Sequence, residues 1–153
     1  MRAVVQRVEK ASVRIDGCVR ATIGKGIVVF LGVEKDDTHR DAEYLLDKIT
    51  NLRIFEDAAG KMNHSVLEVS GEALVVSQFT LLGDTTKGRR PSFVRAEEPA
   101  RAKLLYEYFL KKMTENVGRV AAGEFQAMMK VELINDGPVT LLLDTRKHLQ
   151  DAC

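Results

Sequence analysis

Two short segments of the sequence carry residues whose types and spacing could do chemistry. The first is Ser77-Gln78-Phe79-Thr80, whose polar side chains lie in or at the end of an otherwise apolar run over 73–81. Polar groups in a central strand are either satisfied within the core or mark a place where backbone N–H groups face a ligand. The residues alone leave both interpretations open.

The second segment is Asn135-Asp136-Gly137-Pro138-Val139-Thr140, where glycine and proline separate two apolar alternations. Its ordinary interpretation is a hairpin turn, because glycine and proline commonly occupy turns. A functional interpretation depends on what the two residues lack. Gly137 has no Cβ and Pro138 has no N–H, so together they can present bare carbonyl oxygens to a cationic group.

Familiar catalytic and metal-binding patterns are missing. The sequence has no GxSxG elbow, P-loop, strand-linked GxGxxG or HExxH motif. We therefore expect no metal, no disulfide framework and no cofactor. The few cysteines and histidines form no CxxC, HxH or HxxxH cluster; they are Cys18, Cys153, His39, His64 and His148.

Length and charge exclude several broad classes. The chain has 153 residues, with 23 Lys+Arg against 22 Asp+Glu, a formal charge of +1 and 45% hydrophobic residues. This balance argues against disorder and against a global electrostatic footprint for nucleic acid. A neutral total still permits a local patch. Lys87, Arg89 and Arg90 share one polar loop, which either contacts phosphate or is simply solvated.

Apolar stretches are too short for a membrane span or a secretory leader. Charge interrupts the start of the chain early, and the longest apolar run, Ile27 to Leu31, falls far short of the ~20 residues of a membrane helix. We therefore expect a protein of the reducing cytoplasm with no membrane partner.

Apolar alternation predicts the strands that must position these segments. Period-two alternation covers 11–15 and 19–23, and its unchanged parity across the intervening turn predicts a three-residue loop or a bulge. Continuous apolarity over 27–33 predicts a central strand covered on both faces. Further strands are expected over 53–55, 73–81, 127–133 and 139–143.

Two main helices are predicted. Thr38 followed by Asp41 resembles a capping box, and helical spacing continues over about 39–50. Pro99 suits the first turn of a second helix, which stops near Gly118. No repeat or linker divides the chain, so we expect one α+β domain over 1–153. The second helix is expected to place on one side Leu104, Leu105, Tyr108, Phe109 and Met113.

Four short motifs occur together along the chain: MRAVVQRV at 1–8, SQFTL at 77–81, KGRRPSF at 87–93 and NDGPVT at 135–140. In order and spacing they resemble the bacterial-type D-aminoacyl-tRNA deacylase family, end to end. Each motif is short, but the four together are specific. The resemblance implies an enzyme of translation proofreading. It would hydrolyse the ester joining a D-amino acid, or glycine mischarged on tRNA(Ala), to the 3′-terminal adenosine of tRNA.

The resemblance also implies a fold, an assembly and residue roles. The implied fold is a compact domain whose antiparallel sheets form a β-barrel-like core. The implied assembly is a homodimer that binds the aminoacyl-tRNA 3′ end without cofactor or metal. Phe79 and Thr80 would supply oxyanion-binding N–H groups, with Ser77 and Gln78 at the adenosine end. The Gly-Pro peptide of the second segment would be cis, reach the partner subunit's site and repel L side chains.

Several alternatives are left open by the sequence. Thr80 could act as a nucleophile, although no neighbouring base is visible and the resemblance implies help from the RNA's own 2′-hydroxyl. A related class with a differently oriented Gly-Pro peptide accepts L-alanine on the wrong tRNA. A nucleic-acid-binding role is associated with animal relatives that have a C-terminal extension, which we do not expect here. A scaffold without catalysis is the last alternative.

Overall fold

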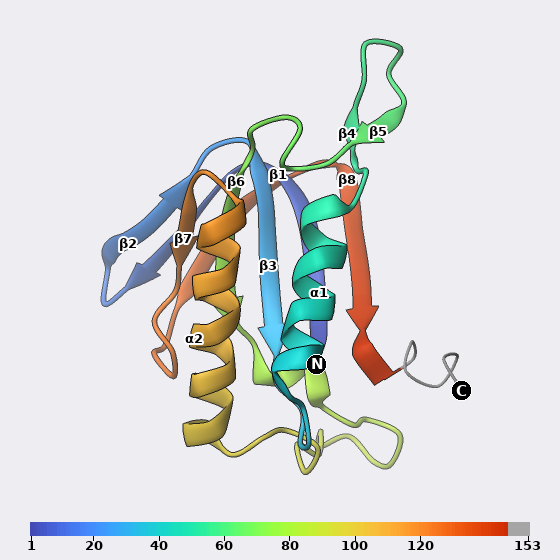
Figure 1. Ribbon diagram of the computed structural model, residues 1–153. Coiled ribbons are helices and arrows are strands. Elements are labelled where there is room, and N and C mark those ends of the chain that lie inside the picture. The colour runs from blue at the N-terminus through green and yellow to red at the C-terminus, as the bar shows by residue number, and fades with distance from the viewer. Residues whose placement is uncertain (147–153) are drawn as a thin grey trace.

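Two helices lie side by side on one face of a curled sheet, and a short hairpin projects beyond one end (Figure 1). The computed structural model describes residues 1–146. It confirms the α+β class and the two main helices. In chain order the elements are β1 (Arg2–Ile15), β2 (Cys18–Ile23), β3 (Gly26–Gly32), α1 (His39–Asn51), β4 (Phe55–Glu56), β5 (Met62–His64), β6 (Glu72–Ser77), the 3₁₀ turn η1 (Phe79–Leu82), α2 (Pro99–Asn116), β7 (Val120–Ala122) and β8 (Lys130–Asp144).

The main sheet is mixed and nearly closes on itself. Its strand order is β2-β1-β3-β6-β7, with β8 also paired to β1. β1 pairs antiparallel with β2, β3 and β8, whereas β3–β6 and β6–β7 are parallel. Parallel neighbours need a crossover connection, and α1 and α2 supply the two crossovers. The core is therefore barrel-like, as predicted, but its sheet is mixed rather than antiparallel throughout.

The outer strands β2 and β7 approach each other at the open side of the barrel. Arg119, which immediately precedes β7, donates from Nη2 to the carbonyl of Thr22 in β2 at 3.3 Å. Its Nη1 also lies 3.2 Å from a carboxylate oxygen of Glu72 in β6. One side chain thus bridges the two edges of the curled sheet.

The connection between β1 and β2 shows how apolar parity determines register. Ile15 pairs with Cys18 across a two-residue turn. Val13 pairs with Ala21 but Arg14 pairs with Val19, so one residue of β2 is extra. The predicted bulge is confirmed. Without it, the apolar residues of the two strands would face opposite sides of the sheet.

The central strands bury side chains on both faces, as their continuous apolarity predicted. Ile27 and Val29 of β3 belong to a core shared with the two helices, which contribute large side chains such as Phe109. Val28 faces the other way and joins Leu74 in a second core inside the curled sheet. The two faces of β3 and β6 therefore connect the helical layer to the barrel interior.

Both helix starts are confirmed. Thr38 N donates to Asp41 Oδ2 at 2.9 Å in a capping box, and Pro99 occupies the first turn of α2. The prediction that Leu104 lies on the same side of α2 as Leu105 and Phe109 is wrong, because Leu104 is 67% exposed. Tyr108 is half-buried and packs against the core, and its hydroxyl donates to a carboxylate oxygen of Glu43. Helical spacing places on one face the buried stripe of α2, which is Ala102, Leu105, Tyr106, Phe109 and Met113.

Several strand boundaries differ from those predicted. β4 is shifted to Phe55–Glu56, β7 is an additional short strand, and β8 begins only at Lys130. Within residues 1–146, no helix is long and apolar enough to cross a membrane.

Candidate active site

The first candidate segment lies where a buried strand ends in a tight turn. β6 stops at Ser77, and the chain then forms η1 instead of continuing as strand to residue 81, so that prediction is wrong. The N–H of Gln78 donates to the carbonyl of Leu31 at 2.8 Å, which ties the strand end to β3. The turn buries Leu82 at 1% exposure and leaves Phe79 58% exposed. Burial of Leu82 explains why the chain turns here.

The N–H groups at the start of this turn face no acceptor. The first N–H groups of any helical turn lack a partner within it. Leu81 N donates to the Gln78 carbonyl at 3.2 Å, and Gly83 N donates to the Thr80 carbonyl at 3.0 Å. In the described chain, no hydrogen bond engages the N–H groups of Phe79 or Thr80. Two neighbouring backbone donors of this kind can stabilise a developing oxyanion.

Among residues 1–146, no base hydrogen-bonds to the Thr80 hydroxyl. Its hydrogen-bond partner is the side-chain amide of Gln78, which donates to Oγ1. An amide N–H cannot accept the proton that a nucleophilic hydroxyl must lose. The arrangement therefore favours a positioning role for Thr80 over a nucleophilic one.

A basic loop adjoins the turn. Lys87, Arg89 and Arg90 are all exposed on it. Two backbone hydrogen bonds between Asp84 and Ser92, of 2.8 and 2.9 Å, close its base. Hydrogen bonds from the backbone and side chain of Thr86 lower the pKa of Asp84. The loop therefore carries three exposed cations, and one anion, Asp84, lies where the loop closes.

Phe93 connects this loop to the turn. Its ring packs edge-on against that of Phe79, with centroids 5.1 Å apart, and its Cε1 would lie 3.0 Å from a Cβ added at Gly83. The predicted catalytic and phosphate-binding segments are therefore neighbours in space. Together they form one exposed surface that carries backbone donors, an aromatic pair and positive charge.

The second candidate segment is a wide bulge inside one continuous strand. β8 pairs with β1 on both sides of it, through Thr140 with Gln6 and Asn135 with Val8. The four residues 136–139 therefore lie opposite the single residue Arg7. The hairpin interpretation is wrong, because the chain does not reverse here. The Gly137–Pro138 peptide is cis, φ of Gly137 is +128°, and both residues are exposed.

The sequence does not single out Arg7, whose guanidinium hydrogen-bonds to the backbone of the bulge. The residue is only 6% exposed. Its Nε donates to the carbonyl of Asp136 at 3.1 Å and lies 3.2 Å from a carboxylate oxygen of the same residue. Its Nη1 donates to the carbonyl of Ile54 at 2.7 Å. A buried arginine usually has a specific partner, but nothing in the sequence pattern identifies which segment of the chain supplies it.

The two candidate segments do not meet within one chain. Leu31 pairs with both Ser77 and Ala3, so the end of β6 lies level with the start of β1. The bulge lies opposite Arg7, on the far side of β1. Strand rise and strand spacing together imply a separation on the order of 20 Å. One copy of the chain therefore presents the two motifs on separate surfaces.

Comparison with known proteins identifies the family. A family model described as D-Tyr-tRNA(Tyr) deacylase matches residues 4–144. Curated relatives named D-aminoacyl-tRNA deacylase come from Syntrophus aciditrophicus and Kosmotoga olearia. Each is 58% identical to this chain, over 96% and 97% of its length respectively and over 99% of the relative. The chain therefore belongs to the D-Tyr-tRNA(Tyr) deacylase family.

Two solved structures share the fold. One, named c-Myc DNA Unwinding Element Binding Protein, superimposes with a TM-score of 0.90 at 42% identity, covering 94% of this chain and 98% of the other. A probable eukaryotic D-amino acid tRNA deacylase superimposes with a TM-score of 0.80 at 17% identity, with the same coverage. The second likeness concerns the fold alone.

The sequence predicts no metal site, because its cysteines and histidines are scattered along the chain. Among residues 1–146, no three His, Cys, Asp or Glu side chains gather closely enough to hold a metal ion. His39 packs on the ring of Tyr108, and His64 lies 3.7 Å from a carboxylate oxygen of Glu68. Cys18 is exposed and forms no disulfide within the described residues. The last two residues of that prediction, at 148 and 153, lie outside the described part of the chain.

Proposed function

We propose that this chain hydrolyses the ester of D-aminoacyl-tRNA, and of glycine mischarged on tRNA(Ala), to free tRNA and amino acid. Its substrate is used in translation, so the proposed location is the cytoplasm and the proposed role is proofreading. The observation that carries the proposal is the pair of unengaged N–H groups at Phe79 and Thr80, on an exposed turn beside a basic loop. Family membership supports the choice of substrate.

In the proposed reaction, water attacks the ester carbonyl carbon. The N–H groups of Phe79 and Thr80 bind the resulting oxyanion, and each donor of this type contributes about 3 kcal/mol. The bond to the 3′ oxygen of the adenosine then breaks, and that oxygen leaves with a proton. Because no described side chain hydrogen-bonds to Thr80 as a base, the 2′-hydroxyl of the RNA is the proposed proton carrier. Ser77 and Gln78 would contact the adenosine.

Selection against L-amino acids is assigned to Gly137-Pro138 of a second copy. With the ester and the ammonium both fixed, a D side chain would point to solvent and an L side chain would collide with this backbone. Rejection by collision leaves the identity of the side chain unread. The separation of the two motifs within one chain supports a homodimer, because only another copy could bring the Gly-Pro bulge to the turn.

The test is ester loss from D-Tyr-tRNA and L-Tyr-tRNA incubated with purified protein. The proposal predicts hydrolysis of the D-ester only. Hydrolysis of L-alanyl-tRNA charged on the wrong tRNA would favour the related L-alanine class. Retention of duplex DNA or tRNA without ester loss would favour a binding protein, an alternative that the name of one structural relative keeps open.

Thr80→Ala is expected to retain measurable deacylation, with kcat reduced by less than about 10-fold, because the backbone N–H at position 80 remains. The measurement is kcat on D-Tyr-tRNA with the variant's fold checked by circular dichroism. A nucleophile would instead predict a loss of about 10⁴-fold or more. Such a loss, together with a trapped acyl-enzyme in the wild type, would contradict the positioning role.

Charge reversal of the basic loop, by Arg89→Glu with Arg90→Glu, is expected to flatten the salt dependence of tRNA binding. Each lost phosphate contact lowers the slope of log K against log salt by about one unit. Filter binding between low and moderate salt measures the slope. Arg20→Glu, an exposed charge on β2, is the matched control. An unchanged slope in the double variant would remove this loop from the tRNA interface.

A further inference from the structure

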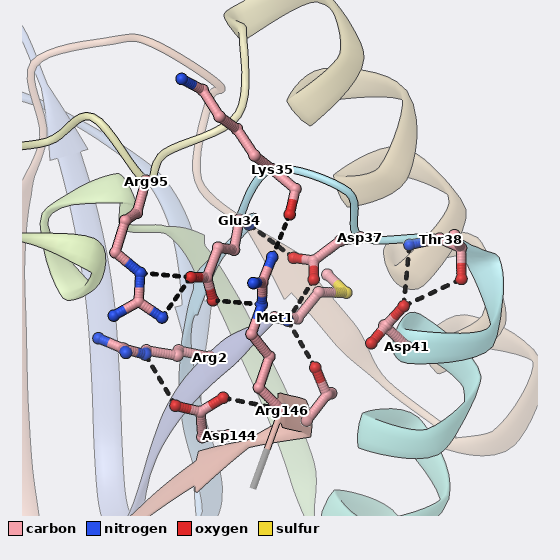
Figure 2. A network of polar contacts seen from close by, with 11 residues as sticks. Met1, Arg2, Glu34, Lys35, Asp37, Thr38, Asp41, Arg95, Asp144 and Arg146 are labelled. Atoms are coloured by element: carbon pink, nitrogen blue, oxygen red, sulfur yellow. Dashed lines mark hydrogen bonds and ion pairs between the residues drawn. The ribbon is translucent and has the colours of Figure 1, made fainter. Parts of the chain in front are cut away.

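The amino-terminal end of β1 is fixed by a buried polar network, which Figure 2 shows. The α-ammonium of Met1 is fully buried and donates to Asp37 Oδ1 at 2.6 Å and to Thr145 Oγ1 at 2.7 Å. Thr145 N donates to the Met1 carbonyl at 3.0 Å. Burial raises the pKa of Asp37, against the lowering effect of the ammonium. The backbone leading into Arg2 therefore has little freedom.

Arg2 hydrogen-bonds to two parts of the fold, the end of β8 and the turn η1. Its Nε donates to Asp144 Oδ2 at 2.9 Å, at the end of β8 (Figure 2). Its Nη1 donates to the carbonyl of Leu81, inside η1, at 3.1 Å. The side chains of Arg2 and Asp144 are only 21% and 10% exposed, so solvent and salt screen this pair less than a surface pair.

The Leu81 carbonyl belongs to the turn that carries the candidate oxyanion donors. Carbonyls at the end of a helical turn lack partners within it, and a four-residue 3₁₀ turn has few internal bonds to resist rotation. A charged donor on this carbonyl therefore fixes the plane of the Leu81–Leu82 peptide, which lies two peptides after the one that carries the Thr80 N–H. The directions of the Phe79 and Thr80 N–H groups depend on the same short turn.

We infer that Arg2 is a positioning residue for the deacylation proposed above. It acts through the Leu81 carbonyl and holds the turn at a constant place relative to the end of β8. The expected change in kcat rests on the proposed function. The expected loosening of the turn does not depend on it. Lysine can reach only one of the two acceptors at a time, whereas the guanidinium fork of arginine serves both.

The test compares Arg2→Met, Arg2→Lys and a matched control. Arg119→Met is the control, because Arg119 also bridges a carboxylate and a backbone carbonyl, but between β2 and β6. On D-Tyr-tRNA, Arg2→Met is expected to lower kcat by about 10-fold with KM changed less than about twofold. Arg2→Lys is expected to recover about half of that loss on a logarithmic scale. Arg119→Met is expected to leave kcat unchanged.

A readout independent of activity is amide hydrogen exchange at the turn. The N–H groups of Leu81 and Gly83 donate within the turn. Their exchange is expected to speed up by about 10-fold in Arg2→Met and to stay at the wild-type rate in Arg119→Met. Wild-type kcat in Arg2→Met, an equal loss in Arg119→Met, or slower turnover without faster exchange would each overturn the inference. If the wild type hydrolysed no D-Tyr-tRNA, the proposed function would fail, and exchange would still decide whether Arg2 fixes the turn.

Discussion

Gly137→Ala is expected to lower the hydrolysis of D-Tyr-tRNA by about 100-fold while changing tRNA affinity less than about twofold. A Cβ at this position would lie 2.8 Å from Val139 Cγ2 and 3.0 Å from Arg7 Nη2. The backbone also has φ of +128°, which side-chain-bearing residues rarely adopt. Because Val139 belongs to the bulge and Arg7 of β1 hydrogen-bonds to it, the added methyl would narrow the proposed pocket or displace the carbonyls proposed to repel L side chains.

The measurement is kcat/KM on D-Tyr-tRNA together with direct binding of uncharged tRNA. Gly60→Ala is the matched control, because φ at Gly60 is also positive, at +73°, and nothing lies within 4 Å of the added Cβ. It introduces backbone strain without crowding. If kcat/KM of Gly137→Ala on D-Tyr-tRNA equals that of Gly60→Ala, the proposed role of Gly137 is wrong.

Arg7→Met is expected to lower the free energy of unfolding by about 2 kcal/mol and deacylation by about 100-fold. The loss of stability comes mainly from the Ile54 carbonyl, which would lose its 2.7 Å donor in a buried place. The Asp136 carboxylate is 46% exposed, so water can replace the ion pair there. The loss of activity comes from the bulge, which Arg7 supports through the Asp136 carbonyl.

Denaturant unfolding and kcat/KM on D-Tyr-tRNA measure the two effects. Arg14→Met is the matched control on the same strand. Its ion pair with Glu132 has both side chains largely exposed, so stability and turnover are expected to stay close to wild type. If Arg7→Met has the stability of the wild type and also keeps full activity, Arg7 does not position the bulge.

The regular elements could be predicted because their signals are local. The capping box at Thr38 and Asp41, Pro99 at the start of α2, and the bulge implied by parity between β1 and β2 all depend on residues close in sequence. The facing of Leu104 was wrong, because the helical spacing of α2 admits two adjacent stripes. Phe109 and Met113 belong to both stripes, and only the burial of Ala102 and Tyr106 in the folded structure distinguishes one from the other.

The candidate site was predicted by residue and not by geometry. Ser77 to Thr80 and Gly137-Pro138 were identified from their types and motifs. The strand predicted for the first segment was wrong, and so was the hairpin interpretation of the second, although the cis peptide that the resemblance implied is present. A strand was expected where burial of Leu82 requires a turn. The hairpin interpretation of the second segment fails because pairing with β1 continues on both sides of the bulge. Neither the burial of Leu82 nor the pairing of the bulge with β1 can be read from the segments themselves.

The sequence by itself determined the apolar periods, the helix starts and the two chemically unusual segments, because each depends on neighbours within a few residues. The tertiary structure alone decided which groups surround those segments. Arg7 reaches the bulge and Arg2 reaches the Leu81 carbonyl across more than seventy positions of the chain, through pairing of β1 with β8 and β3. Such contacts depend on strand register and on the closure of the sheet, which are collective properties of the whole barrel.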